Sequence, residues 1–203
     1  MPKVTEEHRA ARRHEIASAA LRCFARAGFQ QTSMADIIAE SGLSAGAIYG
    51  HYKNKEELVE LAVSEVLDAR FLDVAEARIS EPVLSPAAVV RRILDGLTEQ
   101  LGELQLLIQV WGQVPINPRL GEMASRIGNR VLDMLTGYLS EWYEKRLLMP
   151  PVEAQARARA DAPLFVGIVQ GFVTQSVLFR EFDREGYLEA VERFVSLPAT
   201  TAE

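Results

Sequence analysis

Apolar residues recur at the period of an α-helix along most of this 203-residue chain, and no alternating pattern typical of a strand interrupts them. One stripe, at positions i, i+3, i+4, i+7 and i+8, is formed by Ile16, Ala19, Ala20, Cys23 and Phe24. Helices with one apolar face bury that face against other helices when no sheet is present. We therefore predict an all-α fold of about nine helices.

Glycine and capping residues divide the segment that follows the first helix, which we place at about 7–27. Gly28 ends that helix, because glycine readily adopts the left-handed conformation favoured at a helix end. Ser33, with Asp36 three residues later, resembles a capping box in which aspartate replaces the usual glutamate or glutamine. Gly42 then ends the second helix after barely two turns.

A third and a fourth helix begin at similar signals. Ser44 caps a third helix of only about seven residues. Asn54, with Glu57 three residues later, starts a long fourth helix that reaches about Arg78. Two short helices joined by a tight glycine-containing turn and braced by a longer first helix are the parts of a helix-turn-helix. A small helical bundle with no role on DNA would carry the same signals, so the residue identities must decide.

The rest of the chain is predicted as longer helices that follow a proline-bounded linker at 80–86. These helices cover about 86–102, 103–113, 118–148, 152–182 and 185–197. Pro163 falls inside the fourth of them and should kink or restart it, and the sequence leaves open whether that helix is continuous. We predict three parts: a helix-turn-helix domain at 1–55, a connecting helix at 56–80 and a helical C-terminal domain at 81–203.

Charge is unevenly distributed along the chain. Residues 1–55 carry a net charge of +3 and residues 56–203 a net charge of −9, so a polyanionic partner would meet the N-terminal part. The most apolar run, 164–179, is shorter than the ~20 residues that span a membrane, and the N-terminus lacks the apolar core of a signal peptide. We expect a cytoplasmic protein with no membrane partner, and the single Cys23 excludes an internal disulfide.

The start of the third helix has the composition of a helix that enters a DNA groove. Ser44, Ala45, Gly46 and Ala47 are small enough for close approach to a major groove. Glycine inside a helix costs ~1 kcal/mol relative to alanine, and backbone approach to DNA would explain that cost at Gly46. At Gly50, close packing against the first helix would explain it equally well.

Aromatic and basic side chains follow this small-residue start. Tyr49 and His51 can donate hydrogen bonds to phosphates, whereas Tyr52 is expected to be mainly buried. Lys53 and Lys55 flank the start of the fourth helix, where free backbone N–H groups also favour an anion. Together these residues predict a double-stranded DNA partner.

Several short motifs follow one another in a fixed order along this part of the chain. They are Ala-Ala-x-x-x-Phe in the first helix, Gly-Phe at its end, Thr-Ser before the second helix, Gly-Leu-Ser-x-Gly-x-Ile-Tyr, and Lys-Glu-x-Leu. With them, residues 8–62 closely resemble the DNA-binding domain of the tetracycline-repressor (TetR) family of bacterial transcription regulators. Each motif alone is a weak signal, whereas the ordered set is specific. Ala35, Ile38 and Leu43 depart from the residues that are commoner in the family.

The resemblance implies a dimeric, all-helical repressor with a small-molecule pocket in its C-terminal domain. The DNA contacts of the family fall here on Thr32, Ser33, Ser44, Ala45, Gly46, Ala47, Tyr49, Gly50, His51 and Lys55. Because several of these positions are alanine or glycine, we expect direct base contacts to be few and specificity to depend partly on DNA shape. Two such helices about 34–36 Å apart would bind a pseudo-palindromic operator.

A strongly apolar C-terminal segment is the candidate dimer interface. Residues 164–179 are apolar almost all round, and two glycines one turn apart allow close approach of a second helix. The predicted interface consists of Gly167, Gly171, Gln175, Leu178, Leu188, Val191, Phe194 and Val195. The alternative is a core helix inside one chain, although one subunit would then have to bury every side of it.

The resemblance also places an effector pocket among the C-terminal helices. The predicted apolar lining residues are Trp111, Met123, Met134, Tyr138 and Phe172, and the predicted polar contacts are Gln109, Gln113, Asn129, Gln170 and Thr174. Such a lining favours a hydrophobic or amphipathic effector. A strongly anionic one would need arginines turned inward, and we expect Arg126 and Arg130 to face solvent.

An enzyme would need a constellation that the sequence does not offer. There is no glycine-rich phosphate loop after a strand, and the three histidines all lie at or before position 51 without the spacing of metal ligands. We therefore predict neither a metal site nor a cofactor. The competing hypothesis is a helical ligand carrier or adaptor that does not act on DNA, which would leave residues 42–55 without a purpose. The operator, the effector, the regulated genes and the sign of regulation are not predicted.

Overall fold

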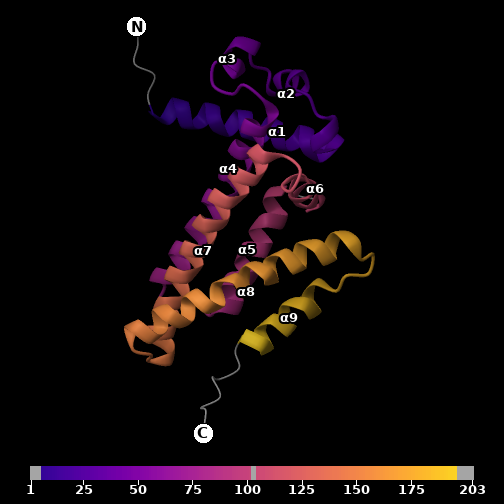
Figure 1. Ribbon diagram of the computed structural model, residues 1–203. Coiled ribbons are helices and arrows are strands. Elements are labelled where there is room, and N and C mark those ends of the chain that lie inside the picture. Colours follow the sequence, from indigo (N-terminus) through magenta and orange to yellow (C-terminus); the bar gives the residue numbers. More distant parts are fainter. Residues whose placement is uncertain (1–5, 102–103, 196–203) are drawn as a thin grey trace. The chain divides into compact units, whose positions relative to one another are not determined.

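The computed structural model describes residues 6–101 and 104–195, and side chains from residue 10 onward. Within these residues the chain forms α-helices and no strand, which confirms the predicted fold class (Figure 1). The helices are α1 (Glu6–Gln31), α2 (Met34–Ser41), α3 (Ala45–Tyr49), α4 (Lys55–Ile79), α5 (Pro86–Leu101), α6 (Gln105–Gln113), α7 (Pro118–Leu147), α8 (Pro151–Leu178) and α9 (Arg184–Val195). The third helix is shorter than the sequence predicted, and α8 runs through Pro163 without restarting.

The chain divides into two compact units that do not follow its order. Unit 1 comprises the described residues of 1–69 and 100–124, and unit 2 those of 70–99 and 125–203. The chain passes between the units inside α4, between α5 and α6, and inside α7. The segment around α6 therefore belongs to the same unit as the three N-terminal helices, which the sequence did not predict.

The core of unit 1 is built on the predicted apolar stripe of α1. All five residues of that stripe are buried, and Ile37 of α2 and Ile48 of α3 are fully buried as well. Gly28 breaks α1 with φ 79° and ψ 162°, a conformation that is essentially restricted to glycine. The break lets Phe29 turn inward, where its ring lies 5.8 Å from that of Phe24.

Helix α6 is fastened to the end of α1 by polar contacts. The backbone N–H of Phe29 donates to Gln109 Oε1 at 3.1 Å, and Gln30 Nε2 donates to Gln113 Oε1. The Cβ of any residue replacing Gly28 would lie 2.8 Å from Gln109 Oε1. The two glutamines predicted to contact an effector are therefore occupied at the end of α1.

Unit 2 is organised around the long helices α7 and α8. Tyr138 of α7 is fully buried, and its hydroxyl donates to Leu84 O at 2.5 Å. Burial raises the pKa of this phenol far above its ordinary value, so it stays a neutral donor. Phe172 of α8 packs edge-on against Phe182 and Tyr187, with ring centroids 5.2 and 5.5 Å away, which anchors α9 to α8.

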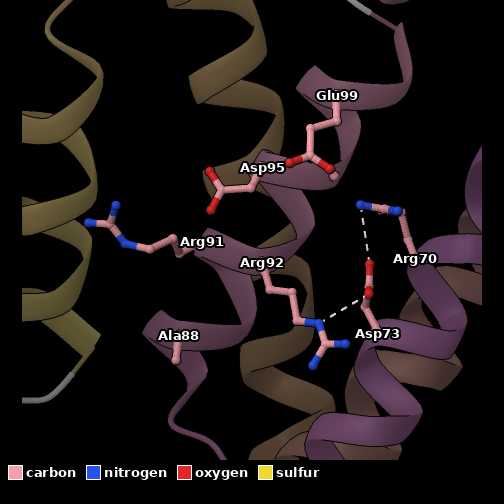
Figure 2. A pocket seen from close by; sticks show the side chains of 8 residues that line it. Arg70, Asp73, Ala88, Arg91, Arg92, Asp95 and Glu99 are labelled. Carbon is pink, nitrogen blue, oxygen red and sulfur yellow. Dashed lines mark hydrogen bonds and ion pairs between the residues drawn. The ribbon is translucent and has the colours of Figure 1, made fainter.

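Ion pairs link the C-terminal half of α4 to its neighbours within unit 2. Arg92 Nε of α5 lies 3.1 Å from Asp73 Oδ1, and Arg70 Nη1 lies 3.2 Å from Asp73 Oδ2 (Figure 2). Arg78 pairs with Glu141 of α7. Unit 2 thus has its charged side chains between helices, above an apolar core.

Helix α8 keeps large apolar side chains on its surface. Leu164 and Leu178 are each 63% exposed, and Phe179 immediately after the helix is 58% exposed. By length and composition alone, α8 is the one helix of the described residues that could cross a membrane, and a single such helix is weak evidence for a membrane protein. An unpartnered packing surface would have the same composition.

Candidate nucleic-acid interface

Helix α3 presents small residues on a buried anchor. Ser44 Oγ accepts a hydrogen bond from Ala47 N at 3.2 Å, which confirms the predicted cap and fixes where the helix begins. Ile48 is fully buried and attaches the helix to the core. The exposed remainder, which we call the recognition face, consists of Ser44, Ala45, Gly46, Ala47, Tyr49, Gly50 and His51.

The two glycines of the recognition face have different surroundings. A Cβ on Gly46 would meet no atom within 4 Å, so nothing inside the protein requires glycine there. A Cβ on Gly50 would lie 3.0 Å from Gly46 O, so glycine relieves crowding within the turn itself. Gly50 is therefore explained locally, although not by packing against α1, whereas Gly46 keeps a surface on which another molecule can come close.

Helix α2 is fixed in orientation by the capping box that the sequence predicted. Asp36 N donates to Ser33 Oγ at 3.2 Å, and Ser33 N donates to Asp36 Oδ2 at 2.8 Å. These hydrogen bonds from Ser33 lower the pKa of Asp36, so the box is intact at neutral pH. Gly42 ends the helix with φ 68°, and Ser33 remains exposed beside the recognition face's own unit.

Two of the predicted DNA contacts are used inside the protein. Thr32 is buried, and its hydroxyl donates to Gly28 O at 2.8 Å and to Cys23 O at 3.2 Å. Lys55 Nζ donates to Phe29 O at 2.9 Å and lies 4.4 Å from the centre of the Phe29 ring. The prediction for Thr32 is corrected, because a buried hydroxyl with these partners cannot reach DNA. Lys55 primarily closes the turn between α1 and α2.

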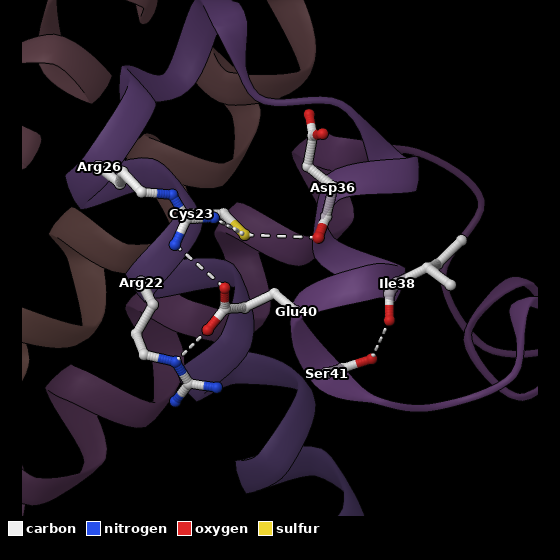
Figure 3. Close-up of polar contacts among 7 residues, drawn as sticks. All are labelled: Arg22, Cys23, Arg26, Asp36, Ile38, Glu40 and Ser41. Atoms are coloured by element: carbon white, nitrogen blue, oxygen red, sulfur yellow. Dashed lines mark hydrogen bonds and ion pairs between the residues drawn. The ribbon is translucent and has the colours of Figure 1, made fainter.

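A carboxylate of α2 is held by two arginines of α1 (Figure 3). Glu40 accepts from Arg22 Nε at 2.7 Å and from Arg26 Nη1 at 3.0 Å. These hydrogen bonds lower the pKa of Glu40, which remains charged at neutral pH. Cys23 lies buried beside this group, where burial raises the pKa of its thiol and leaves it unreactive. Two of the cations of residues 1–55 are thus neutralised within unit 1.

Known proteins share both this helix-turn-helix and the remainder of the chain. A model of bacterial regulatory proteins of the tetR family matches residues 16–62. A model of the C-terminal part of BetI-type transcriptional repressors matches residues 86–197, which is more than half of the chain. The chain belongs to the TetR family.

Individual relatives agree with this assignment. The uncharacterized HTH-type transcriptional regulator YfiR of Bacillus subtilis is 35% identical over 103 residues, which cover 51% of this chain and 49% of that protein. The chain spans about half, or less, of the length of the first curated relatives that it matches.

Two solved structures share the fold. A putative TetR-family regulator from Syntrophomonas wolfei has a TM-score of 0.71 at 18% identity, over 92% of this chain and 93% of that one. GusR of Salmonella enterica has a TM-score of 0.68 at 20% identity, over 95% and 96%. At these identities the likeness shows the fold alone.

The effector contacts that the TetR resemblance implied do not gather in one unit. Gln109, Trp111, Gln113 and Met123 lie in unit 1, and Met134, Tyr138, Gln170, Phe172 and Thr174 lie in unit 2. Tyr138 and Phe172 are fully buried and committed to the packing described above, so we correct the prediction that they line an open cavity. A contact between the exposed Gln170 and an effector stays a prediction.

The dimer residues expected of a TetR-family protein also separate into two groups. Leu188 and Val191 are buried inside unit 2, and the prediction that they form an interface is corrected. A Cβ on Gly171 would lie 2.9 Å from Tyr187 Oη, so α9 already occupies that side. Gly167, Leu178 and Phe194 are exposed, whereas Gln175 and Val195 are half-buried.

Sequence reasoning missed two groups of functional candidates. The contact of Gln109 and Gln113 with α1 joins residues about eighty positions apart, and no local signal announces it. The arginines of α4 and α5 did leave a signal, because Arg91 and Arg92 are followed by Asp95 and Glu99 at helical spacing. That spacing places opposite charges along one side of α5.

Proposed function

We propose that this TetR-family protein is a transcriptional regulator that binds a pseudo-palindromic operator as a homodimer and releases it when a small molecule binds. The observation that carries this proposal is the recognition face, where small exposed residues stand on the fully buried Ile48. A ligand carrier with no role on DNA has no use for an exposed Gly46 that nothing inside the protein requires.

The contacts with DNA divide into positioning and close approach. The exposed Ser33, Tyr49, His51 and Lys53 are suited to phosphates, which fix the register but do not carry sequence information. Alanine and glycine at the helix start allow the backbone near base edges and offer few groups for direct contact. We infer that operator choice depends partly on DNA shape.

Exposed apolar side chains of α8 and α9 support the homodimer. Leu164, Gly167 and Leu178 are spaced along one side of α8, and Phe194 of α9 is 76% exposed. Burying such side chains between two subunits would stabilise a dimer by roughly 25 cal/mol per Å² of apolar surface. The dimer would also bring two recognition helices to one operator.

The release of DNA is proposed as a population shift between two arrangements of the dimer. A ligand weakens DNA binding only by the ratio of its affinities for the two arrangements. Helix α4 is the proposed lever, since its sequence contributes to both units. We retain 1–55, 56–80 and 81–203 as functional domains in this proposal, with the protein acting in the cytoplasm and catalysing no reaction.

Operator fragments recovered by selection from a random DNA pool provide the test. We expect mobility-shift titrations to show binding that weakens steeply with salt, because each neutralised phosphate releases counterions. Gly46→Ala should weaken this binding by about tenfold or more, because the added methyl group blocks close approach. The same change should leave the free energy of unfolding equal or raise it by up to about 1 kcal/mol.

The matched control is Gly112→Ala in α6, another exposed glycine with no atom within 4 Å of the added Cβ. It should change stability as Gly46→Ala does and leave operator affinity intact. A protein that retards no DNA at low salt would be a carrier or adaptor instead. A confirmed effector that saturates the protein without changing operator affinity would remove the proposed coupling.

A further inference from the structure

A charged cavity of about 390 Å³ lies between α4 and α5, entirely within unit 2. Six of its eight lining residues are charged, and they comprise three arginines and three carboxylates: Arg70, Arg91, Arg92, Asp73, Asp95 and Glu99. Its volume falls within the roughly 300–1,000 Å³ of small-molecule sites, but most such sites are lined by apolar side chains. The balance of charges, +3 against −3, matches a ligand that itself carries both signs.

The wall of this cavity is shaped for one arginine. The Arg70 side chain is only 13% exposed, and its guanidinium lies over Gly96 of α5. A Cβ at position 96 would be 1.0 Å from Arg70 Nη1, so any other residue there would displace the guanidinium. The glycine of α5 therefore permits the arginine of α4 to lie flat against the neighbouring helix.

Two buried polar atoms at this wall have no hydrogen-bond partner among the described residues. They are Arg70 Nε, a donor, and Asp73 Oδ2, an acceptor. Arg70 Nη1 lies 3.2 Å from Asp73 Oδ2, but the pair does not have the geometry of a hydrogen bond. Buried donors and acceptors are almost always satisfied in native proteins, so this pair indicates a missing partner that offers one acceptor and one donor close together.

The other side chains around the cavity position this pair. Arg92 pairs with Asp73 Oδ1 and with Glu76 Oε2, and thereby holds the second oxygen of Asp73 toward Arg70 (Figure 2). Arg91 is directed to Glu185 of α9 at 2.9 Å. The unsatisfied capacity of the cavity is therefore concentrated at Arg70 and Asp73.

We propose that the α4–α5 cavity binds a small zwitterion that carries a carboxylate and an ammonium group close together, as a free amino acid does. The carboxylate accepts from Arg70 Nε, and the ammonium donates to Asp73 Oδ2. This inference deepens the proposed function, because such a molecule would be the effector of the regulator. It replaces the hydrophobic or amphipathic effector that the sequence favoured with a strongly polar one.

Calorimetric titration of the full-length protein, without DNA, tests the ligand class. The probes are the protein amino acids, each at millimolar concentration. The best binder is then compared with the carboxylic acid that lacks its amine, with the amine that lacks its carboxylate, and with inorganic phosphate. We expect saturable binding of the amino acid and a loss of about tenfold or more for each truncated probe. Equal binding of the carboxylic acid or of phosphate would overturn the proposal, and so would the absence of binding by every amino acid.

Gly96→Ala tests the site with little risk to the fold, because alanine favours a helix and the only atoms displaced belong to the flexible end of Arg70. We expect this variant to lose amino-acid binding by about tenfold or more. Gly128→Ala in α7 is the matched control, since its Cβ would meet no atom within 4 Å. Arg70→Gln serves as a second variant with the same expected loss. Unchanged binding by folded Gly96→Ala and Arg70→Gln would overturn the assignment.

Failure of this inference is distinguishable from failure of the proposed function. Operator binding is measured without any amino acid, and amino-acid binding is measured without DNA. A protein that binds its operator but no amino acid remains a regulator with a different effector. If both bind, addition of the amino acid should lower operator affinity in the unmodified protein and have about tenfold less effect in Gly96→Ala.

Discussion

Unit 1 and unit 2 are both helical, yet their polar side chains have different partners. In the helix-turn-helix of unit 1, side chains bond mainly to the backbone: Thr32 to Gly28 O, Lys55 to Phe29 O, and Gln109 to Phe29 N. Among the long helices of unit 2, arginines bond mainly to carboxylates on neighbouring helices, as Arg78 does to Glu141.

Helix length explains this difference. Each helix end leaves about four backbone groups without partners inside the helix, so short helices have the larger share of backbone groups to satisfy. Helix α3, with 5 residues, is nearly all end, whereas α7 has 30 residues and most of its backbone is paired internally. Side chains that satisfy buried backbone groups should contribute more to stability than exposed ion pairs between helices.

The largest expected effect tests the backbone of unit 1 directly. Gly28→Ala should lower the free energy of unfolding by about 2–4 kcal/mol, from roughly 1–3 of backbone strain and roughly 1 for the displaced bond between Gln109 and Phe29. Urea denaturation measures this loss. Gly42→Ala separates the two causes, because its φ of 68° is also positive but its Cβ would meet no atom within 4 Å. A Gly28→Ala variant no less stable than Gly42→Ala would show that the contact with α6 contributes nothing.

The same contrast separates what the sequence could and could not predict. The helix starts at Ser33, Ser44 and Asn54 were predictable because capping is a local interaction, and the structure contains each bond. The bond from Phe29 to Gln109 was not predictable, since it joins residues 80 positions apart. Propensity likewise misjudged Pro163, because packing within unit 2 keeps α8 helical through it.

Within the candidate site, burial is what the sequence could not fix. Thr32 and Lys55 were assigned to DNA by resemblance, but exposure depends on the tertiary packing of α1. The small residues at 44–47 were predicted correctly as a helix start, since their identity alone limits what they can contact. The acceptor and donor left at Arg70 and Asp73 are invisible in any sequence, because they result from how two helices meet.

A pair of lysines gives the second prediction. Lys55→Met should lower the free energy of unfolding by about 1–2 kcal/mol, because three carbonyls, those of Phe29, Gln30 and Thr32, lose the ammonium group. Lys53→Met, at an exposed position two residues earlier, should change stability by less than about 0.5 kcal/mol. In operator titrations, Lys53→Met should reduce the salt slope by about 1. Equal stability losses in the two variants would contradict the role of Lys55 as a backbone partner.

The smallest effect is expected in unit 2, where Glu141 accepts from Arg78 and from Lys145. Glu141→Gln should lower the free energy of unfolding by no more than about 1 kcal/mol at pH 7. The hydrogen bond from Arg78 lowers the pKa of Glu141 in the folded state, so its contribution is complete above the ordinary glutamate pKa and is lost as the pH falls through the folded value.

Urea denaturation of both proteins should therefore give curves that converge between about pH 5 and pH 3. Glu189→Gln, at an exposed position of α9, controls for the general loss of one negative charge. If Glu141→Gln destabilised the protein as much as Lys55→Met, ion pairs between long helices would matter as much as backbone contacts in short ones. The proposed link between helix length and the stabilising role of polar side chains would then fail, because surface exposure would not have weakened the pair.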